Sequence, residues 1–322
     1  MSLLVRNIIN KAIKKDRQPH ALCFFYDGKF DRRLWQYDNI KFFGNIGGSK
    51  YPWKTELKHK NLNFIPADFP TIAHGVELDF VICNDRLGPQ YNVAKTYADM
   101  CHLPLVCIEH SLPPRSDTMF LQQMANRNET TLYTNEYVMK RWGIDNHPKH
   151  IFVPYYGYGA APPKVRKDDD KSIDVLVYGN FSNEDLATIY NILKPIKNKV
   201  VLQHSQTNIE DIDNYFAKSK IYLNLAKNNE VPYSVHLAMW CRTAVISTSN
   251  ELTNELIKPE TGRVTSIISK LQTEILNLLD NDEQRQYLVN NAYNTVDNDI
   301  LEYADFDFES IFRKIQNEVY IR

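Results

Sequence analysis

Glycines, paired cysteines and long apolar runs are scarce or absent in this sequence. It has 11 glycines in 322 residues, and its five cysteines include no C-x-x-C pair. An odd cysteine count without framework spacing excludes a disulfide-linked scaffold and predicts buried, reduced thiols in a cytoplasmic protein. No apolar run has the length that spans a bilayer, so no transmembrane segment is expected. The net charge of −1 gives no bulk attraction to nucleic acid or anionic lipid.

The first stretch, 1–15 (MSLLVRNIINKAIKK), is amphipathic and is followed by no small-residue cleavage site. It therefore does not match a secretory signal. We expect a helix that packs on its own domain. The alternative is peripheral contact with a membrane surface through the basic residues of this helix.

Chain length and composition predict two domains. A chain of 322 residues is about twice the usual domain size. The clearest change in composition is the stretch 155–170, in which glycines and prolines precede a charged run. Such a stretch is typical of a linker. We expect domains over 1–158 and 171–300, then a terminal segment, 301–322, with a helix over 308–320.

Apolar strands alternate with helical segments along most of the chain, which predicts an α/β fold with parallel sheets covered on both faces. The expected strands are 20–26, 40–43, 63–66, 79–84, 104–109, 130–134, 150–154, 173–178, 199–203, 221–225 and 244–247. The expected helices are 92–101, 117–125, 135–142, 184–193, 209–218, 235–241, 249–257, 267–279 and 282–296.

The most informative stretch is 219–248, which contains a strand, a polar loop ending at Glu230, a helix and a second strand. In a βαβ unit, the junction between loop and helix binds anionic ligands. Ser234 is placed to cap the helix, and the free N–H groups behind it favour a phosphate. Glu230 is placed to accept hydrogen bonds from hydroxyls of the same ligand. This combination suits a nucleotide-sugar.

The same stretch resembles the donor-binding signature of GT-B fold glycosyltransferases, especially the retaining family 4 type. Glu230 matches the first Glu of that signature, and 238–246 (AMWCRTAVI) fits its tail with substitutions. Leu237 stands near the place of the second Glu, and Arg242 stands in place of the family glycine. The donor motif is therefore degraded. The alternative is that Glu230 is a solvated loop acid in ordinary α/β structure.

Stretches of the first half of the chain resemble the same family in order. They are 105–110 (LVCIEH), 132–138 (LYTNEYV) and 153–157 (VPYYG), and the resemblance covers roughly residues 79 to 265. It implies two Rossmann-like domains with the active site in the cleft between them, and a last helix that crosses back to the first domain.

The resemblance implies candidate site residues at the ends of strands. His110 and Glu230 are the catalytic candidates; His110 would bind a sugar hydroxyl or accept a proton, or else only bond the loop at 113–114. The donor-side candidates are Ser234, Tyr233, Val235, His204, Ser205, Gly179, Asn180, Lys227 and Arg242. The acceptor-side candidates are Asp27, Gly28, Asn84, Asp85 and Arg86.

One departure from the family concerns charge. No Arg or Lys follows the strand that ends at Tyr178, where the family places cations that hold the donor diphosphate. The departing nucleoside diphosphate must be stabilised. Lys227, Arg242, the helix beginning near Ser234 or a first-domain cation, such as Arg86, would have to do so. Asp-x-Asp triplets occur in the chain, for example at 211–213, but none is identified as the metal-binding motif of the other glycosyltransferase fold. We expect neither a metal nor another cofactor.

The leading hypothesis is therefore a glycosyltransferase, with retention implied by the family. The alternatives are a non-catalytic nucleotide-sugar-binding protein and a nucleotide-sugar epimerase or phosphorylase, which fold class alone does not exclude. The expected acceptor is a cell-envelope glycan or lipid. A hydroxymethylated DNA base is the other candidate, with a basic groove and stacking aromatics. The residues for that groove are Lys11, Lys14, Lys15, Arg17, Arg32, Arg33, Trp35, Lys50, Tyr51 and Trp53.

Overall fold

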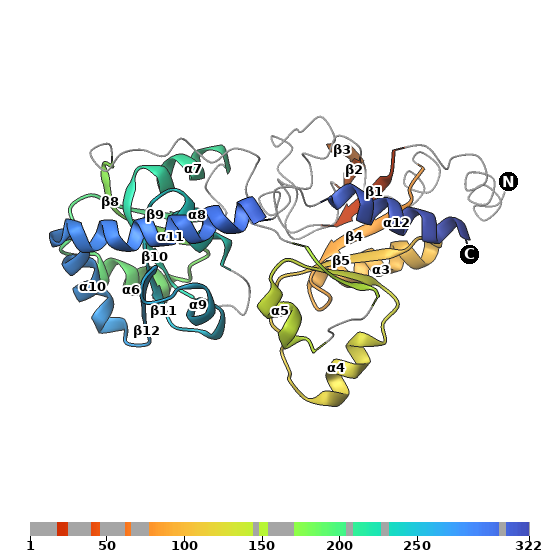
Figure 1. The fold of residues 1–322 in the computed structure, drawn as a ribbon, viewed down its shortest axis with the longest axis horizontal. Coiled ribbons are helices and arrows are strands. Elements are labelled where there is room, and N and C mark those ends of the chain that lie inside the picture. The colour runs from red at the N-terminus through yellow and green to blue at the C-terminus, as the bar shows by residue number, and fades with distance from the viewer. Residues whose placement is uncertain are drawn as a thin grey trace. The chain divides into compact units, whose positions relative to one another are not determined.

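The computed structural model describes residues 18–24, 40–45, 62–65, 77–143, 148–153, 171–203, 209–226, 232–302 and 307–321. The chain divides into two compact units. One consists of Met1–Gly159 and Asp305–Arg322, and the other of Ala160–Ala304. Each unit is built around its own parallel sheet (Figure 1).

The first sheet has the strand order β3-β2-β1-β4-β5-β6-β7, and its paired strands are parallel. The strand order reverses between β1 and β4: β2 and β3 are added in sequence on one side of β1, and β4 to β7 are added on the other side. The strands are β1 (His20–Phe24), β2 (Lys41–Asn45), β3 (Leu62–Ile65), β4 (Phe80–Asn84), β5 (Leu105–Glu109), β6 (Thr130–Tyr133) and β7 (His150–Phe152).

Helices cover both faces of this sheet. On one face, Tyr91, Ala94 and Ala98 of α3 (Pro89–Cys101) pack in a buried cluster with alternate residues of β1, β4 and β5. On the other face, Phe312 of α12 (Phe308–Ile321) stacks on Phe80 with ring centroids 5.3 Å apart. The terminal helix therefore packs in the first unit, although it follows the second in sequence. The remaining described helices of this unit are α4 (Thr118–Ala125) and α5 (Glu136–Arg141).

The second sheet has the strand order β12-β11-β10-β8-β9 and is also parallel. Here the direction of growth reverses between β8 and β10. The strands are β8 (Ile173–Gly179), β9 (Lys199–Gln203), β10 (Ser219–Asn224), β11 (Ala244–Thr248) and β12 (Gly262–Thr265).

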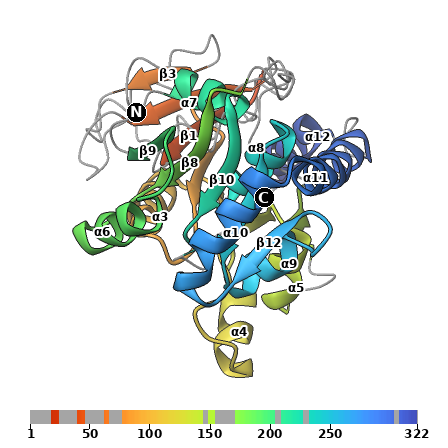
Figure 2. The same cartoon turned by 90° about the vertical axis from the view of Figure 1, so that its left-hand side faces the viewer.

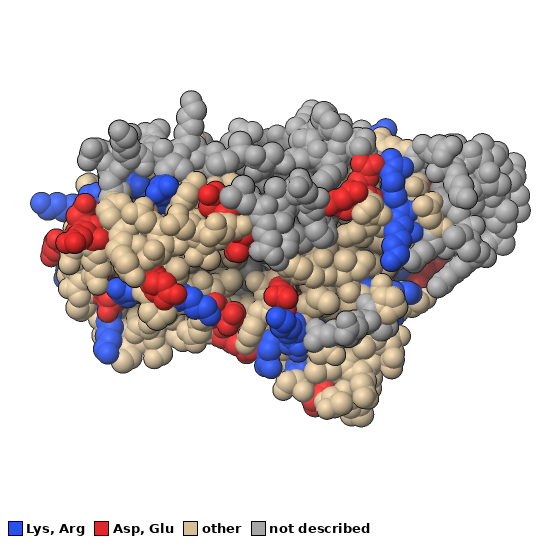
Figure 3. All heavy atoms as spheres, viewed as in Figure 1, with Lys and Arg blue, Asp and Glu red and all other residues tan. Residues whose placement is uncertain are grey.

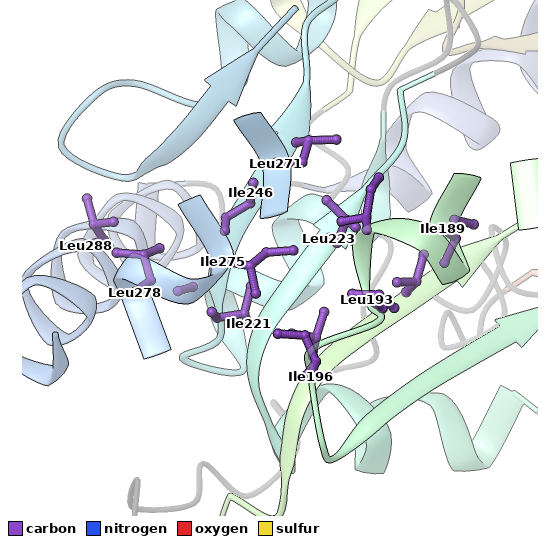
Figure 4. Packing of buried hydrophobic residues seen from close by; sticks show 14 of the residues in the cluster. Ile189, Leu193, Ile196, Ile221, Leu223, Ile246, Leu271, Ile275, Leu278 and Leu288 are labelled. Carbon is purple, nitrogen blue, oxygen red and sulfur yellow. The ribbon is translucent and has the colours of Figure 1, made fainter. Parts of the chain in front are cut away.

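The second unit has the same layered arrangement (Figure 2). Its main core lies on one face of the sheet, where Ile221, Leu223 and Ile246 meet aliphatic side chains of α6, α10 and α11 (Figure 4). On the opposite face, Phe216 of α7 packs edge-on against Tyr222 at 4.9 Å. The helices are α6 (Asn183–Ile192), α7 (Ile209–Ala217), α8 (Tyr233–Trp240), α9 (Glu251–Leu256), α10 (Ile268–Asp280) and α11 (Asp282–Glu302).

The predicted α/β class with two parallel sheets is confirmed. The strand β12 was not predicted, because its four residues (GRVT) are short and partly polar, as an edge strand allows. The helix α11 extends to Glu302 rather than stopping near 296. The expected helix at 1–15 lies outside the described residues.

Candidate functional site

The carboxyl edge of the second sheet brings together the donor-side candidates that the structure describes, with the exception of Arg242. Gly179 ends β8, Asn180 follows it, and Asn224 ends the neighbouring β10. These two strands flank the point at which the strand order reverses, which is where open α/β sheets bind ligands. The helix α8 begins after β10, at Tyr233, as the βαβ interpretation requires.

Ser234 is not the cap that the sequence predicted. The helix α8 starts two residues earlier than expected, so Ser234 lies inside its first turn and Pro232 occupies the cap position without a side-chain cap. Val235 N donates to Pro232 O at 2.8 Å. Ser234 Oγ instead accepts a hydrogen bond from the Tyr222 hydroxyl at 2.9 Å. The first amides of α8 thus receive no side-chain cap, which leaves this helix end suited to an anion.

A polar cluster at this edge is formed by the buried Tyr222, Asn224 and Ser247 together with the half-buried Ser234. Asn224 Nδ2 donates to Ser247 Oγ at 2.9 Å, which links the ends of β10 and β11. Burial raises the pKa of Tyr222, so its hydroxyl remains a donor. Sequence reasoning missed Tyr222 and Asn224. The available signal was two polar-tipped residues in the otherwise apolar strand IYLN.

The start of α6 is already occupied by its own side chains. Ser182 and Asp185 form a capping box, with Ser182 N donating to Asp185 Oδ2 at 2.8 Å and Asp185 N donating to Ser182 Oγ at 3.2 Å. Glu184 adds a second carboxylate to this turn. Two acids at a helix start repel an anion. The helix that follows β8 therefore offers no phosphate site, in agreement with the missing cations.

Arg242 is at the wrong edge of the sheet for a donor phosphate. It follows α8 and precedes β11, so it lies at the amino edge, opposite the end where α8 begins. Its NH1 donates to Asn290 Oδ1 at 3.0 Å, and its guanidinium covers the Tyr293 ring at 3.9 Å. The expectation that Arg242 replaces the family's phosphate-binding cations is wrong.

His236 belongs to the interior of the second unit. It lies in α8, 8% exposed, with its ring 6.4 Å from that of Tyr233. Burial lowers the pKa of His236 to about 4, so the imidazole is neutral at pH 7. Its neighbour Val235 is also buried, so neither side chain presents itself to a ligand.

The first sheet places His110 at its carboxyl edge, as expected. His110 directly follows β5 and is 6% exposed. Its Nε2 lies 3.8 Å from Asp85 Oδ1, and the same oxygen accepts from the Ser111 hydroxyl at 3.2 Å. Asp85 follows β4 with a left-handed backbone (φ 48°). Two predicted candidates, His110 and Asp85, are therefore brought together by neighbouring strands.

Arg86 is held inside the first unit. Its Nε lies 3.5 Å from Glu109 Oε2, and its NH2 donates to the Tyr133 hydroxyl at 2.8 Å. The guanidinium also covers the Trp142 ring at 4.3 Å, and the residue is 1% exposed. Arg86 is thus unavailable to a ligand phosphate, contrary to the sequence-based expectation.

Glu109 is the partner of Arg86 and lies directly before His110. Burial and the nearby Asp85 carboxylate raise the pKa of Glu109 to about 8, while Arg86 and His110 act in the opposite direction. Its carboxylate accepts from Arg86 N at 3.1 Å and from Ser111 N at 3.2 Å. These bonds hold the backbone at Ser111, directly after His110, and at Arg86, directly after Asp85.

Several predicted residues lie outside the described part of the chain. They are Glu230, Lys227, His204, Ser205, Asp27 and Gly28, together with the basic and aromatic residues assigned to a DNA groove. On the face shown in Figure 3, basic and acidic side chains of the described residues are interspersed.

Two searches of the described residues bear on metals and membranes. No group of three His, Cys, Asp or Glu side chains within these ranges is arranged to hold a metal ion. None of the helices in the same ranges combines the length and apolar character needed to cross a bilayer.

Comparisons with known proteins identify the fold. The sequence matches no protein-family model and no curated protein. HepE from Anabaena, in complex with UDP-glucose, is 12% identical with a TM-score of 0.61, covering 94% of this chain and 100% of that chain. Sucrose-phosphate synthase from Thermosynechococcus elongatus is 13% identical with a TM-score of 0.53, covering 94% and 98%.

A third similar structure comes from Listeria monocytogenes and is provisionally assigned as a UDP-N-acetylglucosamine 2-epimerase. It is 10% identical with a TM-score of 0.54, covering 91% of this chain and 97% of that chain. At such identities the likeness shows the fold. The chain has the GT-B architecture of two Rossmann-like domains.

Proposed function

We propose that this protein is a glycosyltransferase that moves a sugar from a nucleotide-sugar donor to an acceptor hydroxyl. The observation that carries the proposal is the likeness, along nearly the whole chain, to a structure that holds UDP-glucose. The resemblance of 219–248 to a donor-binding signature supports it independently of that likeness. Fold alone does not decide function, so the remaining support comes from the site.

The donor phosphate is assigned to the first turn of α8. This turn lies at the carboxyl edge beside the β8–β10 reversal, and it has no side-chain cap. The helix start on the other side of this reversal, in α6, is closed by the Ser182–Asp185 capping box. An anion placed at α8 gains from the helix dipole at a helix start without a side-chain cap. Lys227 is proposed as the accompanying cation and Glu230 as the group that binds sugar hydroxyls.

At the acceptor side, His110 is proposed to interact with the reacting hydroxyl. In the transfer, the bond between the anomeric carbon and the phosphate oxygen breaks, and the acceptor oxygen bonds to that carbon. The acceptor proton passes to His110 or to the departing phosphate. The family resemblance favours retention at the anomeric carbon. We place the acceptor among cell-envelope glycans or lipids, with a hydroxymethylated DNA base as the other candidate.

Thermal unfolding with a panel of nucleoside diphosphates and their sugars tests the donor site. A ligand at a hundredfold excess over its dissociation constant stabilises the folded state by about 2.7 kcal/mol. We expect one nucleotide-sugar to raise the melting temperature of the wild type, and Glu230→Ala to lose most of that rise. Glu283→Ala, which removes an exposed acid of α11, is the matched control and should keep it. No shift with any member of the panel would contradict the proposal.

A nucleotide-sugar epimerase is the second candidate, because one similar structure is assigned to that activity. The two functions differ in their need for an acceptor. An epimerase converts UDP-N-acetylglucosamine to its epimer without any acceptor, whereas a transferase releases UDP only when a hydroxyl, or water, accepts the sugar. Proton NMR of the sugar's anomeric signal after incubation separates the two. Binding without either product would indicate the non-catalytic alternative, which the acidic start of α6 favours.

A further inference from the structure

Asn84 ends β4 at the point where the first sheet reverses its direction of growth. Its strand, β4, lies between β1 and β5. The strands β2 and β3 were added on the other side of β1, so the sheet changes its side of addition between β1 and β4. The carboxyl ends that flank such a reversal are where open α/β sheets bind ligands. Asn84 therefore occupies, in the first unit, the place that Asn224 at the end of β10 occupies in the second.

The side chain of Asn84 is buried with an unsatisfied acceptor. The residue is 2% exposed, and no described residue of the chain forms a hydrogen bond with its Oδ1. Buried amide groups are nearly always hydrogen-bonded, because desolvation without a partner is costly. At a ligand-binding edge, the simplest partner is a group of the ligand. A hydroxyl fits best, because it can both donate to the amide oxygen and accept from the amide nitrogen.

The surroundings of Asn84 select against negative charge. Alternation along β4 and β5, with Asn84 opposite Ile108, puts Asn84 and His110 on the same face at adjacent strand ends. Asp85 follows Asn84, and its carboxylate lies 3.8 Å from His110 Nε2. Two described cations lie near this edge, and both have carboxylate partners. Arg86 is enclosed by Glu109, Tyr133 and Trp142. Arg127 donates to the Arg86 carbonyl at 3.3 Å and lies 3.8 Å from Glu129 Oε1. A phosphate here would meet carboxylate oxygens, whereas an uncharged hydroxyl would be accepted by them.

We propose that Asn84 binds a hydroxyl of an uncharged polyol, such as a sugar ring, next to the hydroxyl that His110 contacts. This inference rests on the proposed function, and it specifies the acceptor class as a neutral sugar or polyol end rather than a phosphorylated one. Asn84 makes only a hydrogen bond and takes no part in bond breaking. Its unsatisfied oxygen in the ligand-free protein is then a stability cost retained for recognition.

The experiment combines sugar binding with thermal unfolding on the full chain. Ligand-observed NMR titrations without any donor would use glucose, N-acetylglucosamine, glycerol and glucose 6-phosphate. We expect a neutral sugar to bind at least tenfold more tightly than its phosphate ester. Asn84→Leu, which replaces the amide with an apolar group of similar size, should weaken that binding about tenfold and raise the melting temperature. Asn92→Leu, at an exposed position of α3, is the control and should leave sugar binding unchanged.

Three results of this experiment would contradict the inference, and one would separate it from the proposed function. Unchanged sugar binding in Asn84→Leu, equal binding of glucose 6-phosphate, or no binding by any sugar would overturn the inference. If Asn84→Leu does not fold, Asn84→Ala provides the same binding test. Because the titrations contain no donor, they are independent of the transfer reaction. Sugar binding that depends on Asn84, in a protein that binds no nucleotide-sugar, would retain this site and reject the proposed transferase.

Discussion

The Tyr222 hydroxyl lies 2.9 Å from Ser234 Oγ and joins the middle of the second sheet to the first turn of α8. Tyr222 is fully buried, and its ring packs edge-on against Phe216. The same hydroxyl is 3.2 Å from the Tyr178 carbonyl at the end of β8. One side chain thus connects β8, β10 and α8, the three elements that surround the proposed phosphate position.

The first prediction concerns this link. Tyr222→Phe and Ser234→Ala each remove one partner of a partly buried hydrogen bond, and each should lower the free energy of unfolding by about 1 kcal/mol. The double variant should lose less than the sum, by about 0.5–1 kcal/mol, because the two groups are in contact. Urea unfolding of the four proteins measures the coupling. Strict additivity would show that the two hydroxyls do not interact.

The second prediction uses the pKa of Glu109. In the unfolded chain its carboxyl titrates at about pH 4.3. In the folded protein, burial raises the pKa of Glu109 to about 8. Between these values the folded state holds a proton that the unfolded state has lost. The stability that Glu109 contributes is therefore complete below about pH 4.3 and is lost as the pH rises toward about 8.

Glu109→Gln cannot titrate and should not show this dependence. The free energy of unfolding of the wild type, relative to that of Glu109→Gln, should fall steadily from pH 5 to pH 8.5. Glu136→Gln, at an exposed position of α5 that pairs with Lys140, is the matched control and should show little change. A difference between wild type and Glu109→Gln that stays constant with pH would contradict the prediction.

The strands and helices of both sheets were largely predictable, because their apolar periodicity is strong. The strand β9 occurs at 199–203 as expected, and the helix expected at 135–142 occurs as α5, where Asn135 accepts from Val138 N at the cap position. The sequence also showed that His110 would follow a buried strand. In each case the local pattern alone determines the outcome, since strand ends and helix caps depend on near neighbours.

Roles that depend on distant contacts were not predictable in the same way. Arg86 follows a strand as a binding residue would, but Glu109, Tyr133 and Trp142, all distant in sequence, enclose it. Ser234 was assigned as a cap because serine favours that position, yet Pro232 stands there and Tyr222 uses the serine hydroxyl. Tertiary partners overrode local preference at both places.

The third prediction concerns Lys171, a buried lysine at the start of the second unit. Its Nζ donates to Ser219 O at 2.8 Å and also to the Arg242 carbonyl, with the residue 5% exposed. Lys171→Met would leave these carbonyls without their charged donor, and should lower the free energy of unfolding by about 2–4 kcal/mol. Lys197→Met, at an exposed position, should change it by no more than about 0.5 kcal/mol. Equal effects of the two substitutions in denaturant unfolding would show that the buried contacts of Lys171 contribute nothing.

The last prediction concerns the backbone at Arg242, where the resembling family has glycine. Arg242 has φ 52°, a left-handed conformation that ends α8, while Thr243 N donates back to Ala238 O at 2.8 Å. Arg242→Ala and Arg242→Gly both lose the contacts with Asn290 and Tyr293. The difference between their free energies of unfolding therefore reports the cost of the left-handed backbone conformation alone. A side chain in this conformation costs roughly 1–2 kcal/mol. Arg242→Gly should therefore be the more stable of the two by about 1 kcal/mol.

The control is a position at which glycine should lower the free energy of unfolding relative to alanine. Ala187 lies at an exposed position within α6, where the backbone is helical, and Ala187→Gly should lower the free energy of unfolding by about 1 kcal/mol. Glycine is thus expected to be favourable relative to alanine at position 242 and unfavourable at position 187. If glycine were the less stable choice at both positions, the left-handed ending of α8 at Arg242 would be contradicted, because no other feature of that position favours glycine over alanine.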